Sequence, residues 1–202
     1  MILLDGKTAS AKALELLVPR IAEVSVHLGR PPHLAAILVG NDGASETYVA
    51  SKVRHCEQYG IKSTLIRFSA ETSEATVLDE IELINANHDI DGLIVQLPLP
   101  AHMNPDRITM SVSPHKDVDG FHPENLGRMA KGLRSFISAT PFGIIKMLEL
   151  YNIETAGKHC VVLGRSHIVG LPVSLLMQRN TYPGNATVTI CHSRTPDVAM
   201  HT

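Results

Sequence analysis

The first hundred residues alternate between two hydrophobic periods. Apolar positions three or four apart, such as Leu17, Ile21 and Val24, predict amphipathic helices. Short apolar runs bounded by Pro or Gly, such as HLAAILVG at 33–40, predict buried strands. The predicted elements are helices at 8–28, 45–59 and 73–87 and strands at 33–40, 61–68 and 90–97. Strands that alternate with helices are typical of a parallel sheet covered by helices.

Single residues set the predicted ends of these helices. Ser73 is a good N-cap for the third helix, and Gly60 is a good stop after the second. Pro19 is expected either to kink the first helix or to begin a second segment there.

The second half of the chain is less regular. Residues 101–138 are rich in Pro, His and Asp, and Thr140 and Pro141 suit the N-cap and first position of a helix. Helices are predicted at 105–111, 123–131, 140–151 and 169–178, strands at 158–163 and 186–191, and a loop at 192–202. A mononucleotide-binding half is β-α-β-α-β, so the final β-α-β predicts an incomplete Rossmann-like lobe with an exposed edge strand. The predicted fold class is therefore α/β, a parallel-sheet N-terminal lobe followed by this incomplete Rossmann-like lobe.

Composition narrows the choice of partner. Hydrophobic residues make up 44% of the 202 residues, and the formal net charge is −2. These values exclude a disordered chain and offer no basic surface for nucleic acid or a membrane. No apolar run approaches the roughly 20 residues that span a bilayer. A small ligand or another protein is the expected partner.

The cysteines and histidines predict neither disulfides nor a metal site. Cys56, Cys160 and Cys191 are an odd number without C-x-x-C spacing, which favours a reducing compartment such as the cytoplasm. Cys160 and Cys191 stand in apolar runs and are expected to be buried. The eleven histidines form no H-x-x-x-H or H-E-x-x-H pair, so no zinc site is predicted.

Tyr48 and Lys52 are the first candidate pair for chemistry. They stand four residues apart on a predicted helix and therefore share one face. A lysine between apolar walls can carry a proton, although a half-buried ring beside a solvated amine is the ordinary alternative. Short-chain reductases also carry Tyr-x-x-x-Lys, but their Gly-rich nucleotide loop opens the chain. The comparable loop here lies far downstream of Lys52, which argues against that class.

Gln96 stands at the carboxyl end of the third predicted strand. Open α/β sheets present ligand-binding groups at this edge. The amide is expected to bind a substrate or to orient Lys52, unless it only caps the end of the strand.

Asp117 and Asp119 lie two residues apart in a predicted turn before Gly120. One carboxylate facing a cleft could accept two parallel N–H donors, such as the edge of an aminopyrimidinone. A metal site is a second option, but no run of further oxygen ligands accompanies the pair. A solvated turn is the third.

The stretch from 159 to 172 predicts phosphate binding. A strand leads through Gly164, Arg165 and Ser166 to a helix near Gly170, whose N-terminus offers free N–H groups. The full G-x-G-x-x-G pattern is missing. The next strand ends in HSRT at 192–195, where a protein selective for NAD usually places an acid. This basic, hydroxyl-bearing end fits a 2′-phosphate and so predicts NADP.

Together these motifs resemble the bifunctional methylenetetrahydrofolate dehydrogenase/methenyltetrahydrofolate cyclohydrolase family. The resemblance covers nearly the whole chain. The matching motifs are LDGK at 4–7, VG at 39–40, SxxYVxxK at 45–52, GLIVQLPLP at 92–100, KDVDG at 116–120, TPxG at 140–143, GRSxxVGxP at 164–172 and CHSRT at 191–195.

The resemblance implies a function and roles for individual residues. The family oxidises 5,10-methylenetetrahydrofolate with NADP⁺ and hydrolyses the methenyl product to 10-formyltetrahydrofolate, commonly as a homodimer. Lys52 would be the catalytic lysine, tuned by Gln96, in a folate cleft that Tyr48 lines and Asp119 closes on the pterin edge. The further implied residues are Leu97 and Pro98 for folate, and Gly164, Arg165, Ser166, Val169, Gly170, Ser193 and Arg194 for NADP. The folate-binding catalytic domain would span 1–139 and the partial NADP-binding domain 140–202.

Two departures from the family pattern keep alternatives open. Ser138 and Ala139 stand where many relatives have Pro-Cys, with little expected effect. Relatives continue beyond residue 202 with further Rossmann strands and a final helix. A catalytically impaired fragment that binds folate or acts as an assembly subunit is the first alternative. A pure NADP-binding module is the second, but it gives no role to Lys52.

Overall fold

The computed structural model describes residues 3–202, which divide into two compact units. One unit is Ala13–Val118. The other consists of Asp119–Thr202 together with the described residues up to Lys12. Within the described residues no helix is both long and apolar enough to cross a membrane.

Helix α1, Gly6–Leu28, begins two residues before the predicted start. The carboxylate of Asp5 explains this, because it accepts the backbone N–H groups of Lys7 and Thr8 at 3.3 and 3.0 Å. The hydrogen bond from the Thr8 hydroxyl is the largest cause that lowers the pKa of Asp5. The helix continues through Pro19, so no second segment begins there. None of its residues is buried; on its predicted apolar side Leu17 and Val24 are exposed and Ile21 is half-buried.

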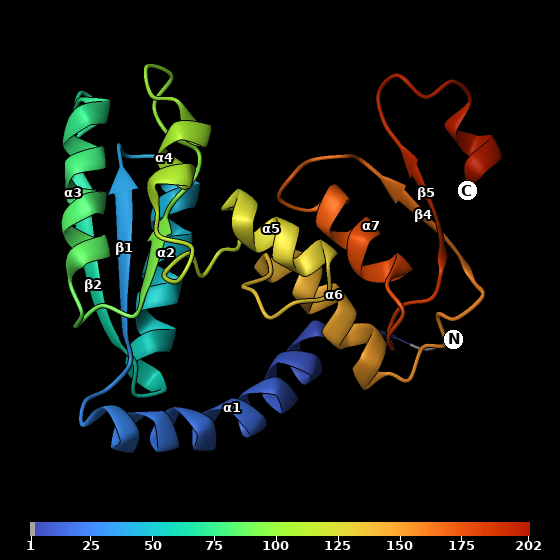
Figure 1. Cartoon of the computed structure of the whole chain (residues 1–202), viewed down its shortest axis with the longest axis horizontal. Helices are drawn as coiled ribbons and strands as arrows, with labels where there is room; N and C mark the ends of the chain where they lie inside the picture. The colour runs from blue at the N-terminus through green and yellow to red at the C-terminus, as the bar shows by residue number, and fades with distance from the viewer. Residues whose placement is uncertain (1–2) are drawn as a thin grey trace. The chain divides into compact units, whose positions relative to one another are not determined.

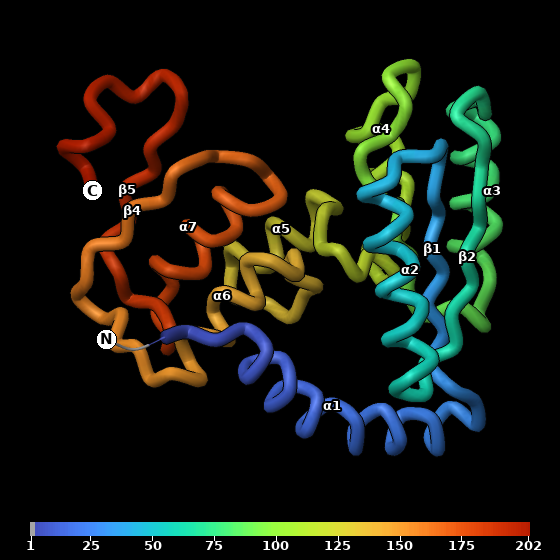
Figure 2. Tube along the Cα trace, turned by 180° about the vertical axis from the view of Figure 1, so that it is seen from behind, coloured from blue at the N-terminus to red at the C-terminus, as the bar shows by residue number. Residues whose placement is uncertain are grey.

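The unit Ala13–Val118 is built on a three-stranded parallel sheet (Figure 1). Its strands are β1 His33–Val39 at the centre, β2 Lys62–Phe68 and β3 Gly92–Val95. Its helices are α2 Gly43–Gln58, α3 Glu74–Ala86 and α4 Pro105–Ser111. In both views α2 and α3 lie on either side of β1 (Figures 1 and 2).

The alternation of side chains along β1 explains this two-sided packing. Ile37 is fully buried and belongs to one core with Ile81 of α3 and Ile108 of α4. Val49 of α2 is also fully buried, and α2 packs against β1 and β2. Each such buried apolar side chain stabilises the fold by roughly 1.5–3 kcal/mol.

The ends of these elements follow mostly from local hydrogen bonds. Ser73 is the N-cap of α3, and Gly60 has the left-handed φ of +74° after α2, as predicted. Asp42 begins α2 earlier than expected, since its carboxylate accepts both the N–H and the hydroxyl of Ser45. Strand β3 covers Gly92–Val95 and is shorter than the predicted 90–97; before its start, the Ile90 N–H closes a turn on the Asn87 carbonyl.

The other unit holds a two-stranded parallel sheet of β4 His159–Leu163 and β5 Thr187–Cys191. Three helices, α5 Pro123–Ala130, α6 Ala139–Leu150 and α7 Gly170–Gln178, belong to it. Figure 1 shows α7 between the strand pair and the other two helices. Ile145 of α6 and Leu176 of α7 form the centre of its core.

Three predictions for this unit are wrong. The N-cap of α6 is Ser138 rather than Thr140, and its side chain makes no capping bond. Pro141 is the third residue of the helix rather than the first, still within the first turn, where backbone N–H groups have no partner in the helix. Residues 192–202 are not all loop, because Val198–His201 forms the short 3₁₀ helix η1. Cys160 is only partly buried, although its surroundings still raise the pKa of its thiol by desolvation. Cys191 is buried, as expected.

Candidate functional site

Lys52 and Gln96 lie in direct contact within the unit Ala13–Val118. The Lys52 Nζ donates a hydrogen bond of 3.2 Å to the Gln96 Oε1. Lys52 comes from the middle of α2 and Gln96 from the residue after β3, and both side chains are half-buried. A partly desolvated amine beside a polarised amide is an arrangement that can hold or move a proton.

Gln96 is fixed by three hydrogen bonds. Its backbone N–H donates to the Ile37 carbonyl at 2.9 Å, which extends the β1–β3 ladder by one residue. Its side-chain Nε2 donates to the carbonyl of Leu97 at 2.7 Å. Because Nε2 is used in this way, Oε1 is left to face Lys52. The amide oxygen therefore contacts the lysine amine directly, which is the contact that an orienting role for Gln96 would need.

Tyr48 stands one turn before Lys52 on α2, and its ring is 65% exposed. Residues four apart share a helix face, so the phenol and the amine open onto the same side of α2. Leu97 follows Gln96 and is half-buried, while Pro98 is exposed. An exposed ring beside a half-buried amine offers a surface on which a flat heteroaromatic ligand can stack.

The two aspartates of the KDVDG motif have different environments. Asp117 is 4% exposed, forms a bridge with Leu93 and belongs to the unit Ala13–Val118. Asp119 is half-buried and begins the long segment of the other unit. Gly120 has φ +67° and packs so closely that a Cβ would lie 2.9 Å from the Ser138 nitrogen. Of the two carboxylates, Asp119 is the more accessible to a ligand.

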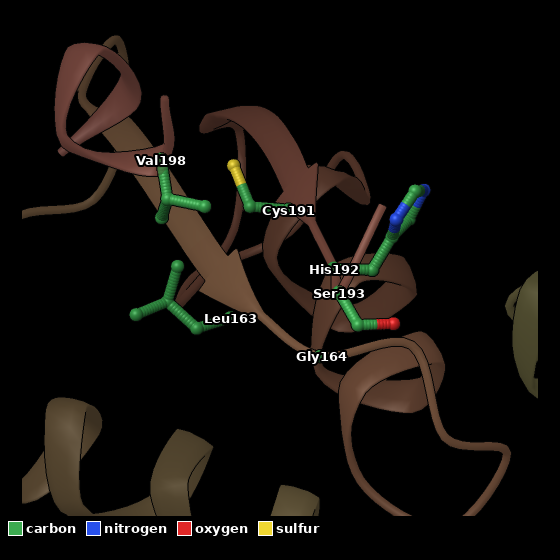
Figure 3. A pocket seen from close by; sticks show the side chains of 6 residues that line it. All are labelled: Leu163, Gly164, Cys191, His192, Ser193 and Val198. Carbon is green, nitrogen blue, oxygen red and sulfur yellow. The ribbon is translucent and has the colours of Figure 1, made fainter. Parts of the chain in front are cut away.

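A cavity of about 380 Å³ lies at the carboxyl ends of β4 and β5 (Figure 3). Figure 3 shows Leu163, Cys191 and Val198 gathered at one end, with the Ser193 hydroxyl at the other beside Gly164. The carboxyl ends of parallel strands are where doubly wound sheets bind dinucleotides. Of the predicted cofactor residues, Gly164 and Ser193 line this cavity.

The loop from Gly164 to Gly170 has the close approach that a phosphate-binding turn requires. A Cβ at Gly170 would collide with the carbonyl of Gly164 and lie 3.0 Å from the Arg165 nitrogen. The Ser166 Oγ accepts the N–H groups of Val169 and Gly170 at 3.1 and 3.3 Å. Ser166 is therefore engaged in capping α7, while Arg165 and Arg194 are exposed cations near the strand ends.

Sequence reasoning gave no role to Leu163, Cys191 and Val198, which line this cavity, and none to His192 beyond its place in the HSRT segment. Leu163 and Cys191 are the last residues of their strands, a position that alone could have pointed to them. His192 follows β5, and Val198 comes from the unpredicted helix η1. Among residues 3–202, no group of three or more His, Cys, Asp or Glu side chains is placed to hold a metal ion.

Two family descriptions match the chain. The catalytic domain of tetrahydrofolate dehydrogenase/cyclohydrolase matches residues 4–119. The NAD(P)-binding domain of the same family matches residues 138–202.

Individual relatives agree with these family matches. The bifunctional protein FolD of Bacteroides fragilis is 52% identical over 98% of this chain and 68% of its own length. FolD of Cytophaga hutchinsonii is 54% identical with the same coverage.

Solved structures give the same result. The Campylobacter jejuni enzyme FolD, a methylenetetrahydrofolate dehydrogenase/cyclohydrolase, matches all of this chain and 70% of its own with a TM-score of 0.93 and 41% identity. The Trypanosoma brucei enzyme, solved with NADP cofactor and an inhibitor, has a TM-score of 0.89 and 28% identity over 98% of this chain and 67% of its own. The chain therefore belongs to the tetrahydrofolate dehydrogenase/cyclohydrolase family.

Proposed function

We propose that this chain oxidises 5,10-methylenetetrahydrofolate with NADP⁺ and hydrolyses the methenyl product to 10-formyltetrahydrofolate. Family membership gives the reaction class. The single observation that carries the assignment to particular residues is the hydrogen bond from Lys52 to Gln96.

The residues at the ends of β4 and β5 fit a phosphorylated dinucleotide. The close approach of the Gly164 backbone to Gly170 gives the tight turn of a phosphate-binding loop, and Arg165 and Arg194 supply positive charge. NADP⁺, when bound, supplies the acceptor for the hydride that leaves the substrate. We assign Gly164, Arg165, Ser193 and Arg194 to its binding, and Ser166, Val169 and Gly170 to the shape of the loop.

The oxidation calls for a group near the reacting carbon that adds no positive charge. Loss of hydride leaves a methenyl carbon that carries positive charge, which an ammonium group nearby would oppose. An amine that donates one N–H to Gln96 Oε1 keeps its lone pair free to face that carbon. Gln96 accordingly holds Lys52 in the orientation that the cation tolerates best.

The same lone pair serves the hydration. The oxygen of water bonds to the methenyl carbon, and one of its protons passes to the Lys52 Nζ. The carbon–nitrogen bond to the pterin ring then breaks, the ring nitrogen takes a proton, and the carbonyl of the formyl group forms. Tyr48 packs on the folate, and Asp119 accepts N–H groups of the pterin edge.

Replacement of Lys52 tests the proposal. Lys52→Met keeps the length of the side chain but removes the amine, and we expect cyclohydrolase activity to fall by at least about 10²-fold, the usual contribution of a proton-transfer group. Lys52→Arg, which stays charged, should be equally impaired. Lys62→Met at the start of β2, an exposed lysine, is the control. Near-normal activity of Lys52→Met would disprove the role of Lys52, and inactivity of the unaltered chain would favour an impaired fragment.

Several finer assignments belong to the same proposal. Tyr48, Gln96, Leu97, Pro98 and Asp119 are proposed as folate-binding residues, with domains at 1–139 and 140–202. A homodimer is proposed from the family alone. A reducing compartment such as the cytoplasm is supported by three free cysteines.

A further inference from the structure

Strand β5 ends at Cys191, and the next four residues form a closed turn. The backbone N–H of Thr195 donates to the His192 carbonyl at 2.8 Å. In return, the backbone N–H of His192 donates to the Thr195 Oγ1 at 2.9 Å. The hydroxyl of Thr195 therefore holds the beginning of the turn to its end.

The imidazole of His192 adds a third hydrogen bond within the turn. The backbone N–H of Arg194 donates to the His192 Nδ1 at 3.2 Å. Because a backbone N–H can only donate, Nδ1 carries its lone pair in this arrangement. The three hydrogen bonds fix the backbone of Ser193 and Arg194, whose side chains are both exposed.

The turn lies at the surface of its unit. His192 and Thr195 are half-buried, and the residues on either side of Thr195 are exposed. A short turn at the surface is held chiefly by its own hydrogen bonds. Through its bond to the His192 N–H, the Thr195 hydroxyl therefore holds the backbone that bears Ser193 and Arg194.

We propose that Thr195 is a positioning residue for cofactor selectivity. In this role Thr195 holds Ser193 and Arg194 where they contact the 2′-phosphate of NADP⁺. This inference rests on the proposed function, since it takes the end of β5 as the 2′-phosphate site. Thr195 acts through the turn, so its loss disorders recognition of the 2′-phosphate but leaves the rest of the nucleotide site in place.

The test compares two nucleotides that differ only at the 2′ position. Adenosine 2′,5′-bisphosphate and AMP are titrated calorimetrically against the 202-residue chain, so that the readout does not depend on turnover. Thr195→Val keeps the shape but removes the hydroxyl, and we expect a roughly five- to tenfold weaker affinity for the bisphosphate and less than about a twofold change for AMP. Thr195→Ser restores the hydroxyl and should restore the preference. Thr187→Val, at the other end of β5 on an exposed threonine, is the matched control.

Three outcomes would overturn the inference, and they differ in what else they affect. If the unaltered chain prefers the bisphosphate and Thr195→Val keeps that preference, Thr195 has no positioning role and the proposed function stands. If the unaltered chain does not distinguish the two nucleotides, the assignment of NADP⁺ to this edge is wrong and the inference fails with it. Loss of selectivity in Thr195→Ser as well would equally contradict a role for the hydroxyl.

Discussion

The sheets of the two units are built differently. In the unit Ala13–Val118, all of β3 and all but one residue of β1 are buried, between helices on both faces. In the other unit, β4 and β5 are mostly half-buried or exposed, and Leu163 is 67% exposed. Both sheets are parallel and carry candidate functional residues at their carboxyl ends.

The comparison shows two ways to fix a functional side chain. Gln96 is held by a backbone hydrogen bond to Ile37, whose side chain is part of a buried core. Packing of that core therefore fixes the position at which Gln96 contacts Lys52. Ser193 is held by a turn that bonds to itself through His192 and Thr195. The first arrangement depends on global stability of its unit, and the second on single polar groups.

The largest expected difference concerns core truncation in the two sheets. Ile37→Ala removes a fully buried side chain and should cost about 2–5 kcal/mol in the free energy of unfolding. Leu163→Ala, on the exposed end of β4, should cost less than about 1 kcal/mol. Urea denaturation followed by circular dichroism measures both. Equal losses would mean that the two sheets do not differ in the way that their burial indicates.

The next effect concerns charge at the nucleotide edge. Arg165→Ala should weaken NADP⁺ binding roughly ten- to a hundredfold, because a charge-assisted contact to phosphate contributes about 1.5–3 kcal/mol. NAD⁺ should be affected much less, which a parallel fluorescence titration would show. Arg134→Ala, an exposed arginine in the same unit, serves as the control. An equal loss for both cofactors would place Arg165 at the shared pyrophosphate.

A third effect separates two glycines of the less covered unit. Gly170→Ala places a methyl group against the backbone of Gly164 and should cost about 1–3 kcal/mol, together with cofactor affinity. Gly127→Ala, inside α5 with open space around its Cα, should instead stabilise by about 0.5–1 kcal/mol. Thermal unfolding of both variants decides this. A neutral Gly170→Ala would show that the loop can move away.

The smallest effect is a pH dependence of stability that arises at the amino ends of β1 and β3. The Asp91 carboxylate accepts hydrogen bonds from Arg30 at 2.7 Å and from the His33 N–H at 2.8 Å, and the Arg30 bond chiefly lowers its pKa. Because the pKa of Asp91 is lowered, the ionised carboxylate stabilises the folded state. This stabilisation is complete above the ordinary carboxyl pKa of 3.8 and is lost as the pH falls below that value.

The expected size is at most about 1 kcal/mol, because the Asp91 side chain is 37% exposed. Urea midpoints between about pH 5 and pH 2.5 should therefore fall less steeply in Asp91→Asn than in the unaltered chain. Asp89→Asn, whose side chain is 81% exposed, should keep the original slope. Identical slopes for all three proteins would contradict the assignment.

Most of the fold could be predicted because hydrophobic period and cap residues agree along the chain. Ser73 and Gly60 mark helix ends by their own chemistry, independently of tertiary contacts. Thr140 failed as a cap although it is a good cap residue, because the N-cap is Ser138 and the helix starts two residues earlier than a Thr140 cap implies. The exposure of α1 could not be predicted either, since periodicity shows that one side is apolar but not what covers it.

The candidate site could be predicted in part. Strand ends and the Tyr-x-x-x-Lys spacing pointed to Lys52 and Gln96, and the structure places these two in contact. The capping role of Ser166 and the turn closed by Thr195 depend on backbone geometry that residue types do not reveal. A hydroxyl near a phosphate loop has the same sequence signature whether it meets a ligand or its own helix.

The backbone bond from Gln96 to Ile37 has a consequence for isotope exchange. An amide proton in a buried ladder exchanges with deuterium only when the ladder opens, and opening here means unfolding the sheet. The amide of Arg194 needs only the His192 ring to swing away. After transfer to heavy water, the amide proton signal of Arg194 should disappear long before that of Gln96. One series of spectra therefore ranks how firmly the backbone is held at the two candidate sites.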